Sequence, residues 1–268
     1  MNVCQRWRRG RANYRPAGEP FNPAHASVAA IDEAPAKAFV LGHHYAASYP
    51  AVRFRAGLFI QERFAREQLV GVAVFSVPMS QHIIPRYFEG LEPNAGVELG
   101  RLVLLDEIAA NAESWFVARA FRLLRTQLSR IRGVLSYSDP LERLTATGEV
   151  VKRGHIGTVY QALNAAYRGR TRPSYITLAR DGRIVSHRAI TKLRAEVKGE
   201  AYAYEQLRAM GAPARRPFES GTEYAARALT DGNFRKVRHP GNHAYTWWVG
   251  ERRARPIWQP QPYPKAAT

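Results

Sequence analysis

The hydrophobic and polar positions of this chain follow two different periods, which predict strands in some segments and helices in others. Residues 52–60 and 69–76 are rich in β-branched and aromatic side chains, and the second run is almost wholly apolar, as in a central strand. Residues 98–105 and 134–138 predict two further strands. Between them, apolar residues recur at helical spacing from about residue 113 to residue 130. The order of strand, helix and strand predicts a sheet that is covered by helices.

Two shorter helices are predicted on either side of this unit. Asp32 can cap a helix with Pro35 in its first turn, and this helix would run to Tyr45. Residues 158–167 predict another helix, which follows the last of the four strands. Both helices are expected to pack on the sheet.

The last third of the chain predicts two hairpins and a helix. Asp181-Gly182 and Pro240-Gly241 each separate two strand-like runs, which is a strong hairpin signal, and residues 191–210 have helical spacing. At 268 residues the chain can bury a full core, so we expect a single α/β domain with a mixed, twisted sheet and helices on both sides. Its expected parts are a flexible basic arm at residues 1–25, a core at 26–180, a basic, aromatic extension of the same domain at 181–250 and a Pro-rich tail at 251–268.

The charge of the chain indicates the class of partner that it binds. It has 40 Lys and Arg against 22 Asp and Glu, which gives a net charge of +18 at pH 7. Such a chain meets phosphate polyanions or anionic membranes far more readily than neutral partners, and we favour nucleic acid as the partner. Arg outnumbers Lys, and its planar fork suits phosphates and base edges. The plainer alternatives are a solubility effect or a ribosome-associated protein.

Other classes of protein are disfavoured by what the sequence lacks. Cys4 is the single cysteine, so an internal disulfide or a Cys-based zinc site cannot form. There is no run of 18 apolar residues, and the first residues lack the apolar segment of a secretion signal. We therefore expect a cytoplasmic protein that does not span a membrane.

Charged residues lie within and at the end of two predicted strands. A regular strand places Arg101 on the side of Leu99 and Val103, where an unpaired charge would cost several kcal/mol. Arg101 either forms a structural ion pair with Glu98 or Asp139, or belongs to a site. Asp139 ends the next strand and precedes a proline, so it is either a turn residue or a base, a metal ligand or an acceptor for an amino group.

Aromatic and histidine side chains supply the other candidates. His44 and Tyr45 end the first helix, where they could bind a transition metal or move a proton, although adjacent histidines also arise by chance. His155 could join the same cluster. Tyr160 lies on a helix after Gly157, and a lone tyrosine in such a place is more often part of the core.

The turn before the helix at residue 113 is a candidate phosphate site. Residues 109–114 read Ala-Ala-Asn-Ala-Glu-Ser, and the backbone N–H groups and positive dipole of a helix start can hold phosphates. Small alanines allow close approach, whereas the carboxylate of Glu113 would repel an anion. The alternative is a capped helix start in which Ser114 is hydrogen-bonded to the backbone.

Taken together, these motifs resemble the Mom DNA-modification proteins of Mu-like phages, an offshoot of the GCN5-related N-acetyltransferase fold. The resemblance covers about residues 30–250, and its specific segments are 98–101, 113–116, 136–139 and 157–164. It implies an acetyltransferase-like mixed twisted sheet with a basic C-terminal extension. The chain departs from the fold's usual Gln/Arg-x-x-Gly-x-Gly/Ala signature at residues 109–114, and residues 140–153 look like an insertion.

The resemblance implies an enzyme that converts adenine N6 in double-stranded DNA to a methylcarbamoyl (acetamido-type) derivative. This product would protect phage DNA from host restriction, and the enzyme would act in the host cytoplasm. Acetyl coenzyme A would supply the acyl carbons, and iron is a possible second cofactor. Because adenine N6 lies within the base stack, the base would be flipped into the site.

The resemblance also implies residue roles. Arg101 would bind an anionic or carbonyl oxygen, and Asp139 would accept from the adenine amine. Tyr160 would serve the thiolate or polarise the acyl group, while His44 and Tyr45 position or activate the acceptor. His44, Tyr45 and Asp139 would form the metal set. The cofactor residues would be Leu104, Asn111, Ala112, Glu113 and Ser114.

The Arg-rich and aromatic C-terminal third is expected to form the DNA face. Basic groups neutralise phosphates, and aromatic rings between them can stack on a displaced base, although the same pattern also suits solvated strand faces. The predicted DNA contacts are Arg168, Arg170, Arg172, Arg188, Lys192, Arg235, Lys236 and Arg238. Two other function classes stay open: an acyl-CoA-dependent N-acetyltransferase acting on a protein or small amine, and a non-catalytic nucleic-acid-binding protein.

Overall fold

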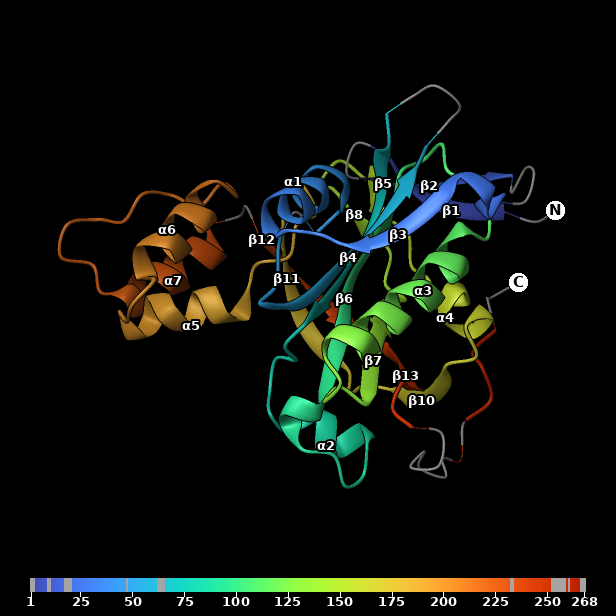
Figure 1. The fold of residues 1–268 in the computed structure, drawn as a ribbon. Helices are drawn as coiled ribbons and strands as arrows, with labels where there is room; N and C mark the ends of the chain where they lie inside the picture. The colour runs from blue at the N-terminus through green and yellow to red at the C-terminus, as the bar shows by residue number, and fades with distance from the viewer. Residues whose placement is uncertain are drawn as a thin grey trace. The chain divides into compact units, whose positions relative to one another are not determined.

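The computed structural model of the chain describes residues 3–8, 11–16, 21–46, 48–61, 66–231, 234–251, 259 and 261–265 (Figure 1). The chain forms two compact units, each built from separate stretches of sequence. The sheet unit comprises Met1–Pro140, Gly154–Thr171 and Asn242–Thr268. The helical unit comprises Leu141–Arg153 and Arg172–Gly241.

A mixed sheet forms the centre of the sheet unit. Among the described residues its strand order is β10-β13-β7-β6-β5-β4-β3. The strands β6 and β7 are parallel, and every other neighbouring pair is antiparallel. The strand bounds are Ala26–Ala30 (β3), Val52–Ile60 (β4), Gln68–Ser76 (β5), Gly96–Leu104 (β6), Gly133–Ser138 (β7), Ala166–Arg170 (β10) and His243–Trp248 (β13).

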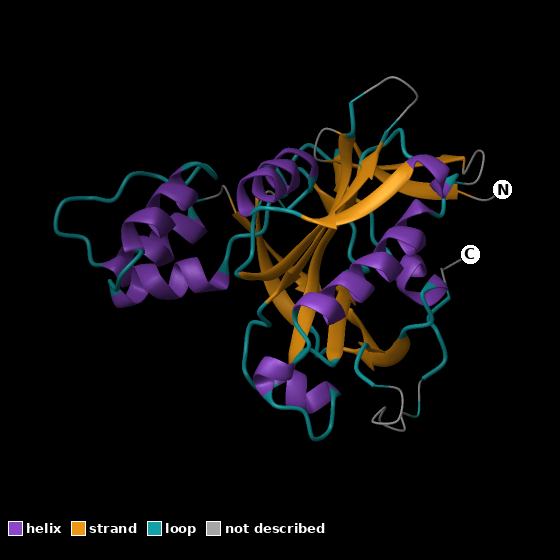
Figure 2. Cartoon of the chain, viewed as in Figure 1, coloured by secondary structure: helices purple, strands orange, loops and turns teal. Residues whose placement is uncertain are grey.

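Helices cover both faces of this sheet (Figure 2). The helices α3 (Ala112–Gln127) and α4 (Thr158–Ala162) lie on one face, and α1 (Glu33–His43) and α2 (Ile83–Tyr87) on the other. The strand β5 shows why, because its successive side chains point to opposite faces. Ala73 and Phe75 pack in the cluster of α3, while Val72 and Val74 pack in the cluster of α1. The predicted fold class, a mixed α/β sheet flanked by helices, is confirmed.

The ends of the sheet unit contain short elements. The strands β1 (Val3–Arg8) and β2 (Arg11–Pro16) form an antiparallel hairpin within the expected basic arm. One-turn helices lie at Pro23–His25 and Pro93–Ala95. In the expected Pro-rich tail, the hydroxyl of Tyr263 donates to the carbonyl of Ala165 at 2.7 Å. Residues 1–2, 9–10, 17–20, 252–258, 260 and 266–268 of these two segments lie outside the described part of the chain.

The helical unit combines three helices with two strand pairs. Its elements are β8 (Arg143–Leu144), β9 (Val150–Lys152), β11 (Ser174–Ala179), α5 (His187–Ala195), α6 (Glu200–Arg208), α7 (Gly221–Thr230) and β12 (Phe234–His239). The helices bury one cluster that includes Leu193, Leu207 and Tyr224. The helix α7 begins with a capping box in which Ser220 and Glu223 each bond the other's backbone N–H.

Three predicted features of the last third differ from the structure. The turn at Asp181-Gly182 forms, but the pairing beyond it is limited to one bridge between Leu178 and Ile184, while β11 pairs along its length with β12 on its other edge. The hairpin expected around Pro240-Gly241 does not form, since β13 pairs with β7 and β10. The helix expected at residues 191–210 is divided into α5 and α6 by a left-handed backbone at Glu196 (φ 50°) and Gly199 (φ 93°). In the described residues, no helix combines the length and apolar character needed to cross a bilayer.

The junction of α5 and α7 should tolerate no side chain at Gly221. A Cβ atom there would lie 1.9 Å from the carbonyl oxygen of Leu193, which is backbone and cannot swing away. We expect Gly221→Ala to lower the free energy of unfolding by about 1–3 kcal/mol in urea denaturation. Gly42→Ala is the matched control, because nothing lies within 4 Å of its Cβ position in α1. That variant should be neutral or more stable by up to about 1 kcal/mol, and equal stability of the two variants would contradict the packing described.

Candidate functional site

The parallel strands β6 and β7 stop pairing part of the way along β6. Their register runs from Gly96 opposite Gly133 to Glu98 opposite Leu135. After this point the hydroxyl of Ser136 donates to the carbonyl of Leu99 at 2.9 Å, while β6 continues beside β5 and β7 beside β13. Ligands of open α/β sheets bind at carboxyl ends of strands where the topology changes. We call the place where these strands separate the divergence point.

A bulge in β6 follows immediately. Phe75 is opposite Leu99 and Val74 opposite Arg101, so Gly100 is the extra residue. A Cβ at Gly100 would lie 2.6 Å from the Ser76 hydroxyl, and glycine avoids that contact. The bulge changes the alternation of side chains along the strand.

The bulge corrects the expected side of Arg101. Leu99 packs in the α3 cluster, whereas Val103 packs in the α1 cluster, although a regular strand would place both on one face. Arg101 therefore shares a face with Val103 but not with Leu99. The extra residue is the physical reason, and the apolar pattern of the strand gives no sign of it.

The guanidinium of Arg101 is bound to the segment after α1. Its Nε donates to the carbonyl of Ser48 at 3.1 Å, and Nη2 to the Ser48 hydroxyl at 2.8 Å. Nη1 donates to the carbonyl of Gly100 at 2.6 Å. Burial lowers the pKa of Arg101, and the neighbouring Tyr45 and Glu98 raise it. The side chain is thus held in place by hydrogen bonds to a loop and its own strand, and it forms no ion pair with another described residue.

Glu98 is a further candidate site residue, although its sequence position predicted only an ion pair with Arg101. Its carboxylate belongs to the last residue pair before the divergence point. Burial raises its pKa, and the nearby charge of Arg101 lowers it. A carboxylate with a raised pKa suits proton transfer near neutral pH. Its position between the apolar Val97 and Leu99 was the available signal.

Tyr160 approaches the same group from α4. Its ring is 7% exposed and packs against the rings of Tyr245 and Trp247, each with centroids 5.4 Å away. Burial raises the pKa of Tyr160 to about 12, while Ser136 lowers it and the neighbouring Tyr45 and Glu98 raise it. Tyr160 therefore keeps its proton at neutral pH. Tyr160 is both a core residue and a hydroxyl donor whose pKa is affected by Tyr45 and Glu98.

The end of β7 adds a buried hydroxyl and the predicted carboxylate. The Oγ atom of Ser138 is buried and has no hydrogen-bond partner among the described residues. A Cβ at Gly157 would lie 3.0 Å from this oxygen, so α4 begins directly beside it. Asp139 follows Ser138, and its carbonyl accepts from the backbone N–H of His155 at 3.0 Å. A buried polar atom without a partner is a place where a polar ligand group can bind.

His44 and Tyr45 lie together at the end of α1. Their rings stack with centroids 4.2 Å apart, and His44 is buried. The Nδ1 atom of His44 accepts from the backbone N–H of Ala46 at 3.0 Å. Within the described residues, no group of three His, Cys, Asp or Glu side chains could hold a metal ion. Tyrosine is not among these ligand types, so the predicted metal set of His44, Tyr45 and Asp139 stays a prediction, and we derive no chemistry from iron.

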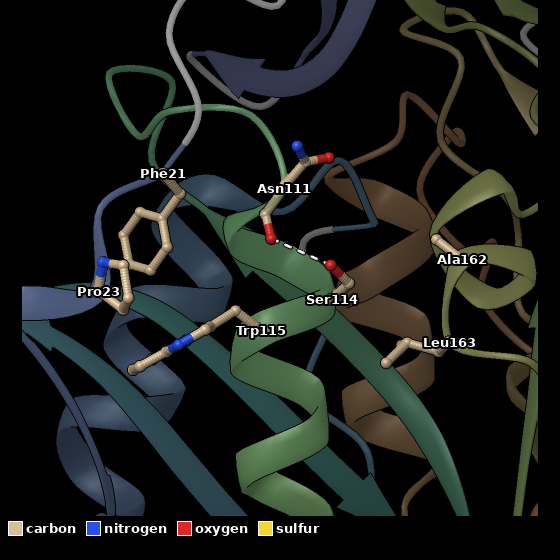
Figure 3. Close-up of a pocket in the computed structure, with 7 residues that line it drawn as sticks. All are labelled: Phe21, Pro23, Asn111, Ser114, Trp115, Ala162 and Leu163. Carbon is tan, nitrogen blue, oxygen red and sulfur yellow. Dashed lines mark hydrogen bonds between the residues drawn. The ribbon is translucent and has the colours of Figure 1, made fainter.

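A pocket of about 450 Å³ opens at the start of α3. Figure 3 shows Asn111 and Ser114 at the helix start on one side, and Ala162 of α4 with the following Leu163 on the other. Asn111 has a left-handed backbone (φ 70°), and the Ser114 hydroxyl donates to its carbonyl at 3.1 Å. The full lining is Phe21, Pro23, Asn111, Ser114, Trp115, Ala162 and Leu163.

The predicted cofactor residues divide between this pocket and the core. Asn111 and Ser114 line the pocket, whereas Leu104 and Ala112 are buried in the α3 cluster. Glu113 is half-buried in the first turn of α3 and is not part of the pocket lining. Ser114 is hydrogen-bonded to the backbone, as the alternative expects, but its hydroxyl donates to a carbonyl and the start of α3 has no side-chain cap hydrogen bond.

The predicted DNA contacts lie in both units. Arg168 and Arg170 belong to β10 of the sheet unit. The helical unit contains Arg172, Arg188, Lys192, Arg235, Lys236 and Arg238. Among these eight side chains, Arg168 and Lys192 are half-buried and the others are exposed.

Comparisons with known proteins bear on the family rather than on the site. No curated protein matches the chain. A solved structure described as a tandem GNAT protein from the clavulanic acid biosynthesis pathway (without AcCoA) is similar at 10% identity, with a TM-score of 0.42. The match covers 84% of this chain and 99% of that one, and the likeness is too slight to support an argument about function. The family model of the Mom protein family matches residues 25–265, and the chain therefore belongs to the Mom protein family.

Proposed function

We propose that the protein is a transferase that modifies adenine at N6 in double-stranded DNA. The observation that carries the proposal is the group of Tyr45, Glu98, Arg101 and Tyr160 at the divergence point of a Mom family member. These side chains reach one place from β6, from α4 and from the end of α1. The net charge of +18 favours a polyanionic substrate. A modified adenine would protect phage DNA from host restriction enzymes.

The chemistry assigned to these residues is proton transfer and stabilisation of oxygen. Arg101 is held by Ser48 and would bind a carbonyl or anionic oxygen. Tyr160 keeps its proton and would donate it to a leaving group or acyl oxygen. Glu98, with its raised pKa, and Asp139 at the end of β7 are the candidates to accept a proton from the adenine amine. The target base would leave the duplex to reach them.

The pocket at the start of α3 is the proposed place for acetyl coenzyme A. Asn111 and Ser114 line it, and the first N–H groups of α3 have no partner in an earlier helical turn. Ala109 in this turn is small and leaves room near the backbone, whereas Ala110 and Ala112 are buried. The bound cofactor would supply the acyl carbons. A methylcarbamoyl product also contains a nitrogen that an acetyl group lacks, so this finer assignment requires a second, nitrogen-containing donor.

Nucleoside mass spectrometry tests the proposed function directly. Plasmid DNA from cells that express the chain should contain a deoxyadenosine of increased mass. DNA from cells that express Arg101→Ala should not, and the melting temperature of that variant shows whether it is folded. Unmodified DNA from the wild type, combined with tight DNA binding, would favour a non-catalytic nucleic-acid-binding protein. A modified protein or small amine would favour an ordinary N-acetyltransferase.

The hydroxyl of Tyr160 should matter more to activity than to folding. Tyr160→Phe keeps the ring contacts with Tyr245 and Trp247 and removes only the proton donor. Positioned acids of this kind contribute about 10²–10⁴-fold in rate, so we expect a loss of that size in adenine modification. Val159→Ala on the same helix should instead cost about 1–2 kcal/mol of stability, with activity per folded molecule retained. Modification by Tyr160→Phe near the wild-type level would show that the hydroxyl is idle.

The carboxylate of Glu98 should lower the stability of the fold and should be needed for DNA modification. Its folded-state pKa is raised above the unfolded value, so the folded protein binds this proton more tightly than the unfolded chain. The carboxylate therefore destabilises the fold above the raised pKa, and this cost disappears as the pH falls below the unfolded value. We expect Glu98→Gln to be more stable than wild type at pH 8, with the difference vanishing near pH 4, and to modify DNA poorly. Urea denaturation across this range checks the sign, and lower stability of Glu98→Gln at pH 8 would contradict it.

A further inference from the structure

We infer that the ribbon of β11 and β12 enters the major groove of duplex DNA with one of its two faces. This inference rests on the proposed function, and it assigns to the helical unit the task of holding the duplex. The face in question carries Tyr175, Thr177, Lys236 and Arg238, and we call it the basic face.

The register of the ribbon places these four side chains on one side. Tyr175 is opposite Arg238, and Thr177 is opposite Lys236. Residues directly opposite each other, and residues two apart in one strand, share a face of a β-ribbon. Tyr175 is 65% exposed, and the side chains of Lys236 and Arg238 are also exposed. The basic face therefore presents two cations and an aromatic ring to solvent.

The cations of the basic face are available, unlike other arginines of this unit. The ammonium of Lys236 lies 4.8 Å from the centre of the Tyr175 ring, a cation–π contact that orients both side chains. By contrast, Arg227 is engaged by Glu219 at 2.6 Å. Arg215 is likewise engaged by two glutamates of its own unit. Within the described residues, Lys236 and Arg238 have no such carboxylate partner.

The opposite face of the ribbon is occupied by the protein itself. Leu178 on that face is buried, and Arg235 opposite it donates to the carbonyl of Leu144. Arg235 is therefore not part of the basic face, and its contact with DNA stays a prediction. Ala179 and Phe234, which the register places on the same side as the basic face, pack in the cluster of α5, α6 and α7. The ribbon is thus anchored at this end by a hydrophobic core, and at its other end both strands continue into β10 and β13.

The shape of the ribbon selects duplex DNA among polyanions. The major groove of B-form DNA is about 12 Å wide and admits a two-stranded β-ribbon. The major groove of an RNA duplex is deep and narrow, so side chains cannot read it. An anchored ribbon also loses little conformational freedom when it binds. Lys236 and Arg238 would contact phosphates or base edges, and Thr177 and Tyr175 would contact the floor of the groove or the sugar edge.

The test compares two double variants that lose the same charge. Lys236→Gln with Arg238→Gln removes both cations of the basic face, and Arg122→Gln with Arg125→Gln removes two exposed cations of α3. Binding to a 20-base-pair DNA duplex is measured by fluorescence anisotropy between about 50 and 200 mM salt. We expect the basic-face variant to bind at least 10-fold more weakly and to lower the salt slope by about 2, one unit for each phosphate contact. The control should change affinity less than about 3-fold.

The outcomes separate this inference from the proposed function. If the wild type binds and modifies DNA but the two double variants weaken binding equally, the basic face is not the contact surface and the proposed function stands. If the basic-face substitutions weaken binding to an RNA duplex of the same sequence as much as binding to DNA, insertion into the major groove is excluded. If the wild type neither binds nor modifies DNA, both proposals fail. Unchanged melting temperatures of the double variants, expected for exposed side chains, show that the ribbon is intact.

Discussion

Two parallel strands stay hydrogen-bonded only where their residues are in register. The strands β6 and β7 stay in register for three residue pairs. Beyond Glu98 and Leu135 each strand follows its other neighbour, and the extra residue Gly100 in β6 makes the parting abrupt. Every feature of the candidate site depends on this loss of pairing. It turns Arg101 away from the cluster of α3, and it places the end of β7 beside α4. An unbroken ladder would have filled the same space with alternating apolar side chains.

Removing the polar groups of this site from water costs free energy. Burial raises the pKa values of Glu98 and Tyr160 and lowers that of Arg101, so each of these groups is pushed toward its neutral form. Their mutual contacts offset part of the desolvation, and two hydrogen bonds from Arg101 to Ser48 offset more. A poorly hydrated carboxylate, guanidinium and phenol within one group favour proton transfer, because none of them is saturated by water.

The sequence was informative where a segment is long and its period is regular. The central strands and α3 follow from their apolar patterns, and Arg101 and Asp139 were notable because charge interrupts such a pattern. Strand pairing in the last third could not be found in this way. The turn residues Asp181 and Gly182 favour a local hairpin, which is limited to one bridge, whereas the long ladder of β11 forms on its other edge with β12, more than fifty residues away in sequence. Likewise, Glu98 differs from an ordinary strand glutamate only through burial that the whole fold creates.

The helical unit is built from two stretches of chain, Leu141–Arg153 and Arg172–Gly241, with β10 of the sheet unit lying between them in sequence. A single insertion or deletion therefore cannot add or remove this unit and leave the sheet unit intact. Recombination that exchanges this unit between relatives has to preserve four junctions, one of which directly follows Asp139 and Pro140. Variation in the helical unit is thus inherited together with the end of β7. The proposed DNA-binding ribbon and the residues of the candidate site are expected to diversify as one genetic block.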